Sequence, residues 1–159
     1  MNITVISLGK LKEKYLRDAI DEYSKRIAAY GKLDIIELNP VRLSDNPSQT
    51  EISNALSKEA EEIKKKIPSG SYIYALCIEG KELSSEKLAE SINSALLNGK
   101  SNIVFIIGSS FGMSEEIKRL ADYRLSFSPM TFPHQLMRVM LLEQVYRAFQ
   151  INNNGKYHK

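Results

Sequence analysis

Two hydrophobic periodicities alternate along the whole length of this 159-residue chain. Short, nearly continuous apolar runs, typical of strands buried on both faces, predict strands over Asn2–Leu8, 33–38, 71–79, Asn102–Ile107 and Tyr123–Ser126. Apolar residues at steps of three and four predict helices over 14–30, 48–67 and Ser85–Leu97, from Ser114, and over about 133–151. Strands that alternate with helices through short links favour an α/β domain around a mainly parallel sheet.

Local signals refine this pattern. Ser48 and Glu51 have the spacing of a capping box, which predicts a helix start, and Gly80-Lys81 predicts a turn after the third strand. The strand Asn102–Ile107 is the most apolar and is expected at the centre of the sheet. Since no linker-like segment or internal repeat occurs, we expect residues 1–159 to form a single domain.

Composition excludes several classes of protein. With 43% hydrophobic and 26% charged residues, the chain is globular rather than disordered. Its apolar runs are far shorter than the ~20 residues of a membrane span, and its first residues lack the features of a signal peptide. We expect a cytoplasmic protein with no membrane partner.

The few cysteine and histidine residues limit metal chemistry. One Cys and two His form no cluster with zinc-type spacing, so we expect no metal site. Cys77 lies in an apolar run, where a small core residue is the expected role. His134 opens the last helix, where we expect a surface residue.

The net charge of +3 lies entirely in the last 22 residues, because Met1–Met137 carries 18 charges of each sign. Lysine and arginine gain free energy from phosphate contacts, so a polyanionic partner is one explanation of this basic end. A solvated polar tail is the other. Charge alone favours neither.

The last helix is apolar around most of its circumference, and such a helix must be buried on more than one side. Its apolar residues are Leu136, Met137, Val139, Met140, Leu141, Leu142, Val145, Tyr146, Ala148 and Phe149. A second subunit or the rest of the same chain could supply the second side. We favour a homodimer.

Three segments lie where parallel sheets bind ligands, beyond the carboxyl ends of strands. Gly108 and Gly112 bound a loop before a helix, although neither a dinucleotide motif nor a P-loop is complete there. The loop 127–134 is stiffened by two prolines and contains two phenylalanines that could enclose a planar base. Leu76, near the end of the third strand, is the third segment.

The end of the chain is both aromatic and basic. Tyr157 could stack on an unpaired base, Lys156 and Lys159 could contact phosphates, and His158 could exchange a proton near neutral pH. Chain ends are often frayed, so a tail without function is the alternative.

These residues together resemble the RlmH family, small SPOUT-class methyltransferases of large-subunit ribosomal RNA. The resemblance spans the whole chain. Its motifs are Leu8-Gly9-Lys10, Ile78-Glu-Gly-Lys81, Ile106-Ile-Gly108 with Gly112, Leu125-Ser126, Met130-Thr-Phe-Pro-His134, Met137-Arg138-Val139, Glu143-Gln-Val-Tyr-Arg-Ala148 and Tyr157-His-Lys159.

The resemblance implies a SPOUT-type fold, a mainly parallel sheet flanked by helices whose C-terminal part forms a trefoil knot. Periodicity alone favours an unknotted sheet, because knots are rare. The resemblance further implies a homodimer that transfers a methyl group from S-adenosylmethionine to N3 of a pseudouridine in 23S ribosomal RNA within the ribosome. A DNA partner is not expected.

The family pattern also implies which residues bind the methyl donor. They are Leu76, Gly108, Phe127, Ser128, Pro129, Met130, Thr131 and Phe132. Two positions depart from the pattern. Ser109 stands where many relatives have a second glycine, and Pro129 has no N–H to offer the adenine.

Methyl transfer to N3 of a pseudouridine requires a base, because N3 must lose a proton. On the implied function, His158 is the candidate base or proton relay and Tyr157 a stacking platform. Lys159 and Arg138 are the candidates to hold RNA or to stabilise the developing uracil anion.

Two other functions compete with this one. A Rossmann-type methyltransferase needs a glycine-rich turn after the first strand, where the chain has only Gly9, and Glu37 at the end of the second strand does not replace it. A non-enzymatic ribosome- or RNA-binding module would explain the basic tail but not the loops 108–112 and 127–132. Binding of S-adenosylmethionine distinguishes such a module from an enzyme.

Overall fold

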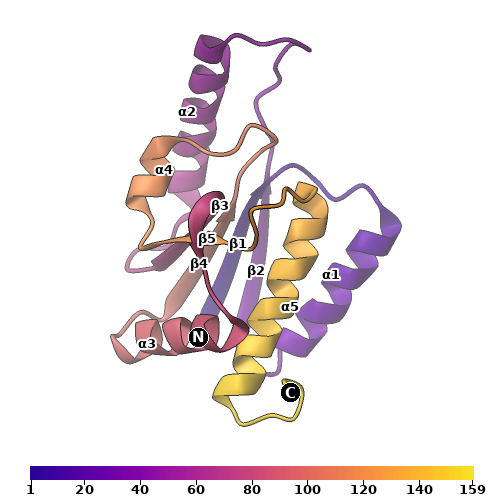
Figure 1. Ribbon diagram of the computed structural model, residues 1–159, viewed down its shortest axis with the longest axis vertical. Coiled ribbons are helices and arrows are strands. Elements are labelled where there is room, and N and C mark those ends of the chain that lie inside the picture. Colours follow the sequence, from indigo (N-terminus) through magenta and orange to yellow (C-terminus); the bar gives the residue numbers. More distant parts are fainter.

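The computed structural model describes residues 1–159 and contains the predicted alternation of strands and helices (Figure 1). The strands are β1 (Asn2–Leu8), β2 (Lys32–Leu38), β3 (Tyr72–Glu82), β4 (Asn102–Ile107) and β5 (Tyr123–Ser126). The helices are α1 (Lys14–Ile27), α2 (Gln49–Lys66), α3 (Ser85–Leu97), α4 (Glu115–Leu120) and α5 (His134–Asn152). None of these helices combines the length and the apolar character that crossing a membrane requires.

The five strands form one sheet in the order β2-β1-β4-β3-β5, and every neighbouring pair is parallel. The apolar strand β4 lies in the middle, as predicted. Since all the strands are parallel, their carboxyl ends meet at one edge of the sheet. The α/β class and the mainly parallel sheet are confirmed.

Helices cover both faces of the sheet (Figure 1). On one face α1, α3 and α5 pack on strand residues that include Val5 and Phe105. On the other face α2 and α4 pack on Ile6, Val104 and Ile106. Adjacent strand residues enter different cores, which explains why these strands are apolar at nearly every position.

The predicted capping box is present at the start of α2. The Glu51 N–H donates to the Ser48 hydroxyl over 3.1 Å, and the Ser48 N–H donates to the Glu51 carboxylate over 3.3 Å. Two of the unpaired N–H groups at the helix start are thereby satisfied.

The predicted turn at Gly80-Lys81 is wrong. β3 continues to Glu82, and after an irregularity between Leu76 and Lys81 it pairs again with β5. A Cβ atom at Gly80 would lie 2.6 Å from the Arg124 carbonyl oxygen, so glycine is required there by close backbone contact and not by a turn. The predicted end of the first helix is also too late, because α1 ends at Ile27.

The apolar helix α5 is covered mainly by its own chain. It packs on the sheet between α1 and α3, and Leu141, Leu142 and Val145 are buried there. Leu136, near the start of the helix, is exposed, and Met140 is half-buried. The second side of the helix is therefore supplied largely within one subunit.

Candidate active site

A pocket of about 230 Å³ opens at the carboxyl edge of the sheet, beyond the ends of β4 and β5 and beside the part of β3 that continues past its pairing with β4. Residues 76–79 of β3, the turn after β4 and the segment after β5 form most of its wall. The lining residues are Leu76, Cys77, Ile78, Glu79, Ile107, Gly108, Ser109, Ser110, Gly112, Met113, Lys118, Leu125, Phe127, Ser128, Met130, Thr131, Phe132, His134 and Met137. The structure thus brings together all of the predicted donor-binding residues except Pro129, which is exposed beside the pocket.

The turn after β4 is closed by its own backbone. The Ser109 N–H donates to the Gly112 carbonyl over 3.0 Å, and the Gly112 N–H donates back to the Ser109 carbonyl over 2.8 Å. A Cβ at Gly108 would lie 2.3 Å from the Gly112 carbonyl oxygen, and Gly112 has a φ of 89°. Both glycines are therefore required, whereas Ser109 has no left-handed conformation that would need one.

The segment after β5 is shaped by two serines. The Ser126 hydroxyl donates to the Ser128 carbonyl over 3.2 Å, and the Met130 N–H donates to the Ser128 hydroxyl over 3.0 Å. Phe127 packs against the core, and Pro133 occupies the N-cap position of α5. Hydrogen bonds of the two serines consequently hold the first part of this segment in place.

One ion pair lies in the wall of the pocket, between Glu79 and Lys118. The hydrogen bond from Lys118 lowers the pKa of Glu79. Burial alone would lower the pKa of Lys118, but its hydrogen bond and attraction to Glu79 outweigh burial and raise that pKa. Both groups therefore remain charged at neutral pH. Nothing in the sequence pattern signals this pair, because its members come from separate elements.

Two further wall residues correct expectations from the sequence. His134 is half-buried in the pocket rather than on the open surface, and burial lowers its pKa, which favours the neutral imidazole. Cys77 also lines the pocket instead of filling the core. Burial raises the pKa of its thiol, so the thiol is a poor nucleophile there.

Arg138, expected to contact RNA or a developing anion, is buried inside the protein with 1% of its surface exposed. Its Nη1 donates to Glu37 Oε2 over 2.6 Å and its Nη2 donates to the Gly9 carbonyl over 3.1 Å. These bonds tie the start of α5 to the ends of β1 and β2. In this arrangement the guanidinium is out of reach of a bound RNA.

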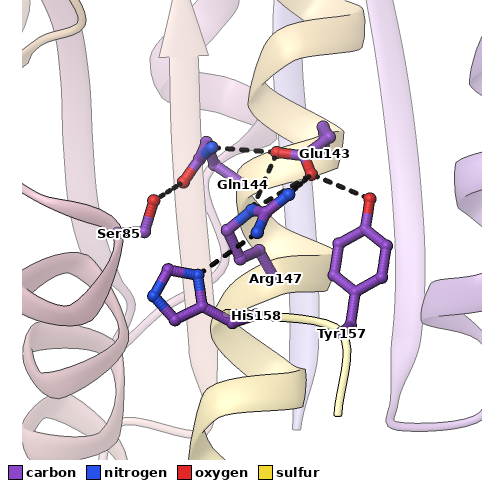
Figure 2. A network of polar contacts seen from close by, with 6 residues as sticks. All are labelled: Ser85, Glu143, Gln144, Arg147, Tyr157 and His158. Carbon is purple, nitrogen blue, oxygen red and sulfur yellow. Dashed lines mark hydrogen bonds and ion pairs between the residues drawn. The ribbon is translucent and has the colours of Figure 1, made fainter. Parts of the chain in front are cut away.

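The C-terminal tail folds back along α5 and joins a polar network (Figure 2). The Tyr157 hydroxyl donates to Glu143 Oε1 over 3.0 Å, and the Arg147 guanidinium lies 4.6 Å from the centre of the Tyr157 ring. Arg147 also donates to Glu143 over 2.6 Å. The network continues through Gln144 to Ser85 at the start of α3. The side chain of Tyr157 is thus held against its own subunit.

Both ring nitrogens of His158 have partners. Arg147 Nη1 lies 3.2 Å from Nδ1, and Glu86 Oε1 lies 2.8 Å from Nε2. A guanidinium can only donate, so Nδ1 accepts and the proton of the neutral ring lies on Nε2, facing Glu86. Lys159, the last residue, is exposed.

Within one chain the tail and the pocket are separate. None of Arg138, Tyr157, His158 and Lys159 lines the pocket. Tyr157 donates a hydrogen bond to α5, and His158 has polar partners on α5 and α3. The structure therefore assembles the predicted donor-binding residues at one place and the predicted tail residues at another.

Comparison with known proteins identifies the family. A family model described as "Predicted SPOUT methyltransferase" matches residues 1–158. "Putative ribosomal RNA large subunit methyltransferase H" of Methanococcus maripaludis (strain C5) is 57% identical over 159 residues, which cover 100% of both chains. "Ribosomal RNA large subunit methyltransferase H 1" of Clostridium perfringens (strain SM101) is 55% identical, and "Ribosomal RNA large subunit methyltransferase H" of Clostridioides difficile (strain 630) is 52% identical, each with the same full coverage. With a parallel sheet whose carboxyl edge carries the pocket, this chain belongs to the SPOUT methyltransferases and, among them, to the RlmH family.

Proposed function

We propose that this protein transfers a methyl group from S-adenosylmethionine to N3 of a pseudouridine in 23S ribosomal RNA, on the assembled ribosome in the cytoplasm. The observation that carries the proposal is the pocket at the carboxyl edge of the sheet, lined by all the donor-binding residues that the family pattern implies except Pro129. The names of the full-length relatives support ribosomal RNA as the substrate.

The residues of the pocket fit S-adenosylmethionine. Leu76, Ile107 and Phe127 offer apolar surface for an adenine ring, and the backbone of segment 127–132 lies against the same space. Glu79 and Lys118 present one charge of each sign, which matches the ammonium and carboxylate groups of an amino acid. When bound, S-adenosylmethionine supplies an electrophilic methyl group on a sulfur that carries its own positive charge.

The chain's own residues must position the pseudouridine and remove its N3 proton. N3 forms the new bond to the methyl carbon while the bond from that carbon to sulfur breaks, so the pocket must align the three atoms. His158 is proposed to accept or relay the N3 proton, Tyr157 to stack on the base, and Lys159 to hold RNA. His158 must first give up its contact with Arg147, because Nδ1 is the ring nitrogen without a proton and Arg147 donates to it.

The separation of tail and pocket favours action as a homodimer. A tail held against α3 and α5 of its own subunit reaches a donor only if a second copy presents its pocket to it. Exposed apolar side chains at Ile78, Met130 and Leu136 surround the pocket and its neighbouring helix, and a second subunit would cover them.

The test is transfer of a radiolabelled methyl group from S-adenosylmethionine to intact ribosomes from a strain that lacks this protein, with free ribosomal RNA assayed alongside. We expect label only in intact ribosomes, at N3 of a pseudouridine in the large-subunit RNA. Failure of both substrates, although the protein binds the donor, would contradict the substrate assignment. A protein that gives no saturable heat with S-adenosylmethionine would be a non-enzymatic RNA-binding module.

A further inference from the structure

Glu59 is a buried acidic residue that has no part in the proposed reaction. It lies on α2, on the side that packs with Ala55, Ala60 and Ile63, and only 5% of its surface is exposed. None of the ion pairs in the molecule includes Glu59. Burial of a carboxyl group is costly unless hydrogen bonds compensate it, so its two hydrogen-bond partners are what make this position tolerable.

The two partners of Glu59 come from distant parts of the chain. Its Oε1 accepts a hydrogen bond from the Ser109 hydroxyl over 3.1 Å, and its Oε2 accepts one from the Val41 N–H over 2.9 Å. Val41 lies in the loop after β2, and Ser109 in the turn after β4. One carboxyl group therefore joins α2 to two loops at the carboxyl edge of the sheet.

Ser109 connects this carboxyl group to the pocket. It is 7% exposed, it lines the pocket, and its backbone closes the turn with Gly112. The Ser109 hydroxyl has one other acceptor, the Gly112 carbonyl at 3.4 Å, which belongs to the same turn. Without Glu59 the turn would keep its internal bonds but lose its hydrogen bond to α2.

We propose that Glu59 is a positioning residue for the methyl donor, holding the Ser109–Gly112 turn against α2 in the conformation that binds S-adenosylmethionine. The inference rests on the proposed function. If only a fraction of the molecules have the turn in the binding conformation, the apparent Kd equals the intrinsic Kd divided by that fraction. The bound complex itself is the same. Glu59 thus acts through the turn and does not touch the reacting atoms.

Calorimetric titration of the full chain with S-adenosylmethionine tests this role. We expect Glu59→Ala and Ser109→Ala each to raise the Kd about tenfold, the size of one lost hydrogen bond. Glu59→Gln should recover most of the affinity, because the amide oxygen can accept from Val41 and the amide N–H can donate to the Ser109 hydroxyl. The matched control on α2 is Glu62→Gln, which removes only an exposed pair with Lys65 and should leave the Kd unchanged.

Kinetics separate positioning from a general loss of stability. Positioning predicts a higher KM for the donor with an unchanged kcat at saturating donor, measured well below the Tm of each variant. A lower Tm with an unchanged Kd and KM would contradict the inference, and Ser109→Ala decides it if Glu59→Ala does not fold. An unaltered protein that binds no S-adenosylmethionine would instead contradict the proposed function and this inference with it.

Discussion

Arg138 is the fully buried charged side chain of α5, and its contacts explain its burial. The guanidinium joins Glu37, at the end of β2, and the Gly9 carbonyl, just beyond β1, while its Nε has no partner. A buried charge of this kind is retained only when it is paired, and removal of one partner leaves the other group unsatisfied.

We expect Arg138→Met to destabilise the fold. The loss should be about 3 kcal/mol, at the lower end for a broken buried pair, because Glu37 is partly exposed and can rehydrate. Urea unfolding measures it, with Arg119→Met on the exposed side of α4 as the control that changes little. A variant as stable as the original that has lost methyl transfer would show that Arg138 acts in the chemistry after all.

Glu86 makes the contact between tail and α3 dependent on pH. A hydrogen bond from its own backbone N–H, then those from His158 and Ser84, lowers its pKa from 4.5 to about 2. A carboxyl group whose pKa is lower in the folded than in the unfolded protein stabilises the folded state at any pH where it is ionised in both states. This contribution is complete above about pH 4.5 and is lost as the pH falls toward 2.

We expect the Tm of Glu86→Gln to fall less than that of the original protein when the pH is lowered from 5 to 3. Thermal unfolding at a series of pH values provides the measurement. His158→Ala should show part of the same effect, since it removes one of the three donors. Identical pH dependence in all three proteins would mean that the Glu86 contacts contribute nothing to folding.

At the scale of elements, β3 and β5 depend on one close backbone contact. Gly80 lies against the Arg124 carbonyl. β3 pairs with β5 up to Leu76, and the pairing resumes at Lys81 after the irregularity. Residues 76–79 of β3 and Leu125 of β5 line the pocket.

Gly80→Ala should therefore separate the second part of β3 from β5. We expect a loss of about 3 kcal/mol, because a methyl group placed against a backbone atom forces the chain apart. The pocket should also lose affinity for S-adenosylmethionine. Urea unfolding and calorimetric titration measure the two effects, with Lys81→Ala as the control on the exposed side of the strand. Normal stability and affinity in Gly80→Ala would show that β5 can shift at no cost.

The sequence predicted most of the elements because their signals are local. The Ser48 and Glu51 capping box and the apolar run of β4 each depend on neighbouring residues alone. A glycine in a turn and a glycine under a crossing backbone give the same signal, so the sequence predicts a turn at Gly80 where the structure has a close backbone contact. The sequence predicts a surface position for His134 because the residues that cover it come from other parts of the chain.

The part of the candidate site that follows from the order of parallel strands and loops could be predicted from the sequence. Loops after parallel strands converge at one edge, which located Gly108 and the segment 127–132. The Glu79–Lys118 pair and the Glu59–Ser109 bond join residues that are 39 and 50 positions apart, and no periodicity connects them. The path of the tail back along α5 was likewise set by contacts such as Tyr157 with Glu143, and not by a local signal.

The tail is an element whose removal should separate donor binding from turnover. A chain that ends at Lys156 keeps every residue of the pocket, so its affinity for S-adenosylmethionine should be nearly unchanged. Methyl transfer should be abolished, because the proposed base and stacking platform are gone. Calorimetric titration and the radiolabel assay measure the two quantities. Unchanged turnover would contradict the role proposed for Tyr157 and His158.

At the scale of the whole molecule, the tail and the pocket of one subunit lie apart. The network of Figure 2 holds Tyr157 and His158 against α5 and α3, while the donor pocket opens at the carboxyl edge of the sheet. In a twofold dimer, if the tail of the first subunit faces the pocket of the second, the tail of the second also faces the pocket of the first. The active unit is therefore proposed to combine the pocket of one subunit with the tail of the other.

Complementation between two inactive variants tests this arrangement. One variant carries Gly108→Val, which distorts the turn in the pocket wall because even a Cβ would lie 2.3 Å from the Gly112 carbonyl oxygen, and the other ends at Lys156. Neither should transfer methyl groups alone. After mixing and subunit exchange, about half of the dimers are mixed, and each has one intact pocket facing one intact tail, so about a quarter of the original activity should return. Light scattering must show a dimer for both variants. Mixed dimers without activity would mean that the tail serves the pocket of its own subunit, which would require it to leave Glu143 and Glu86 and swing across α5.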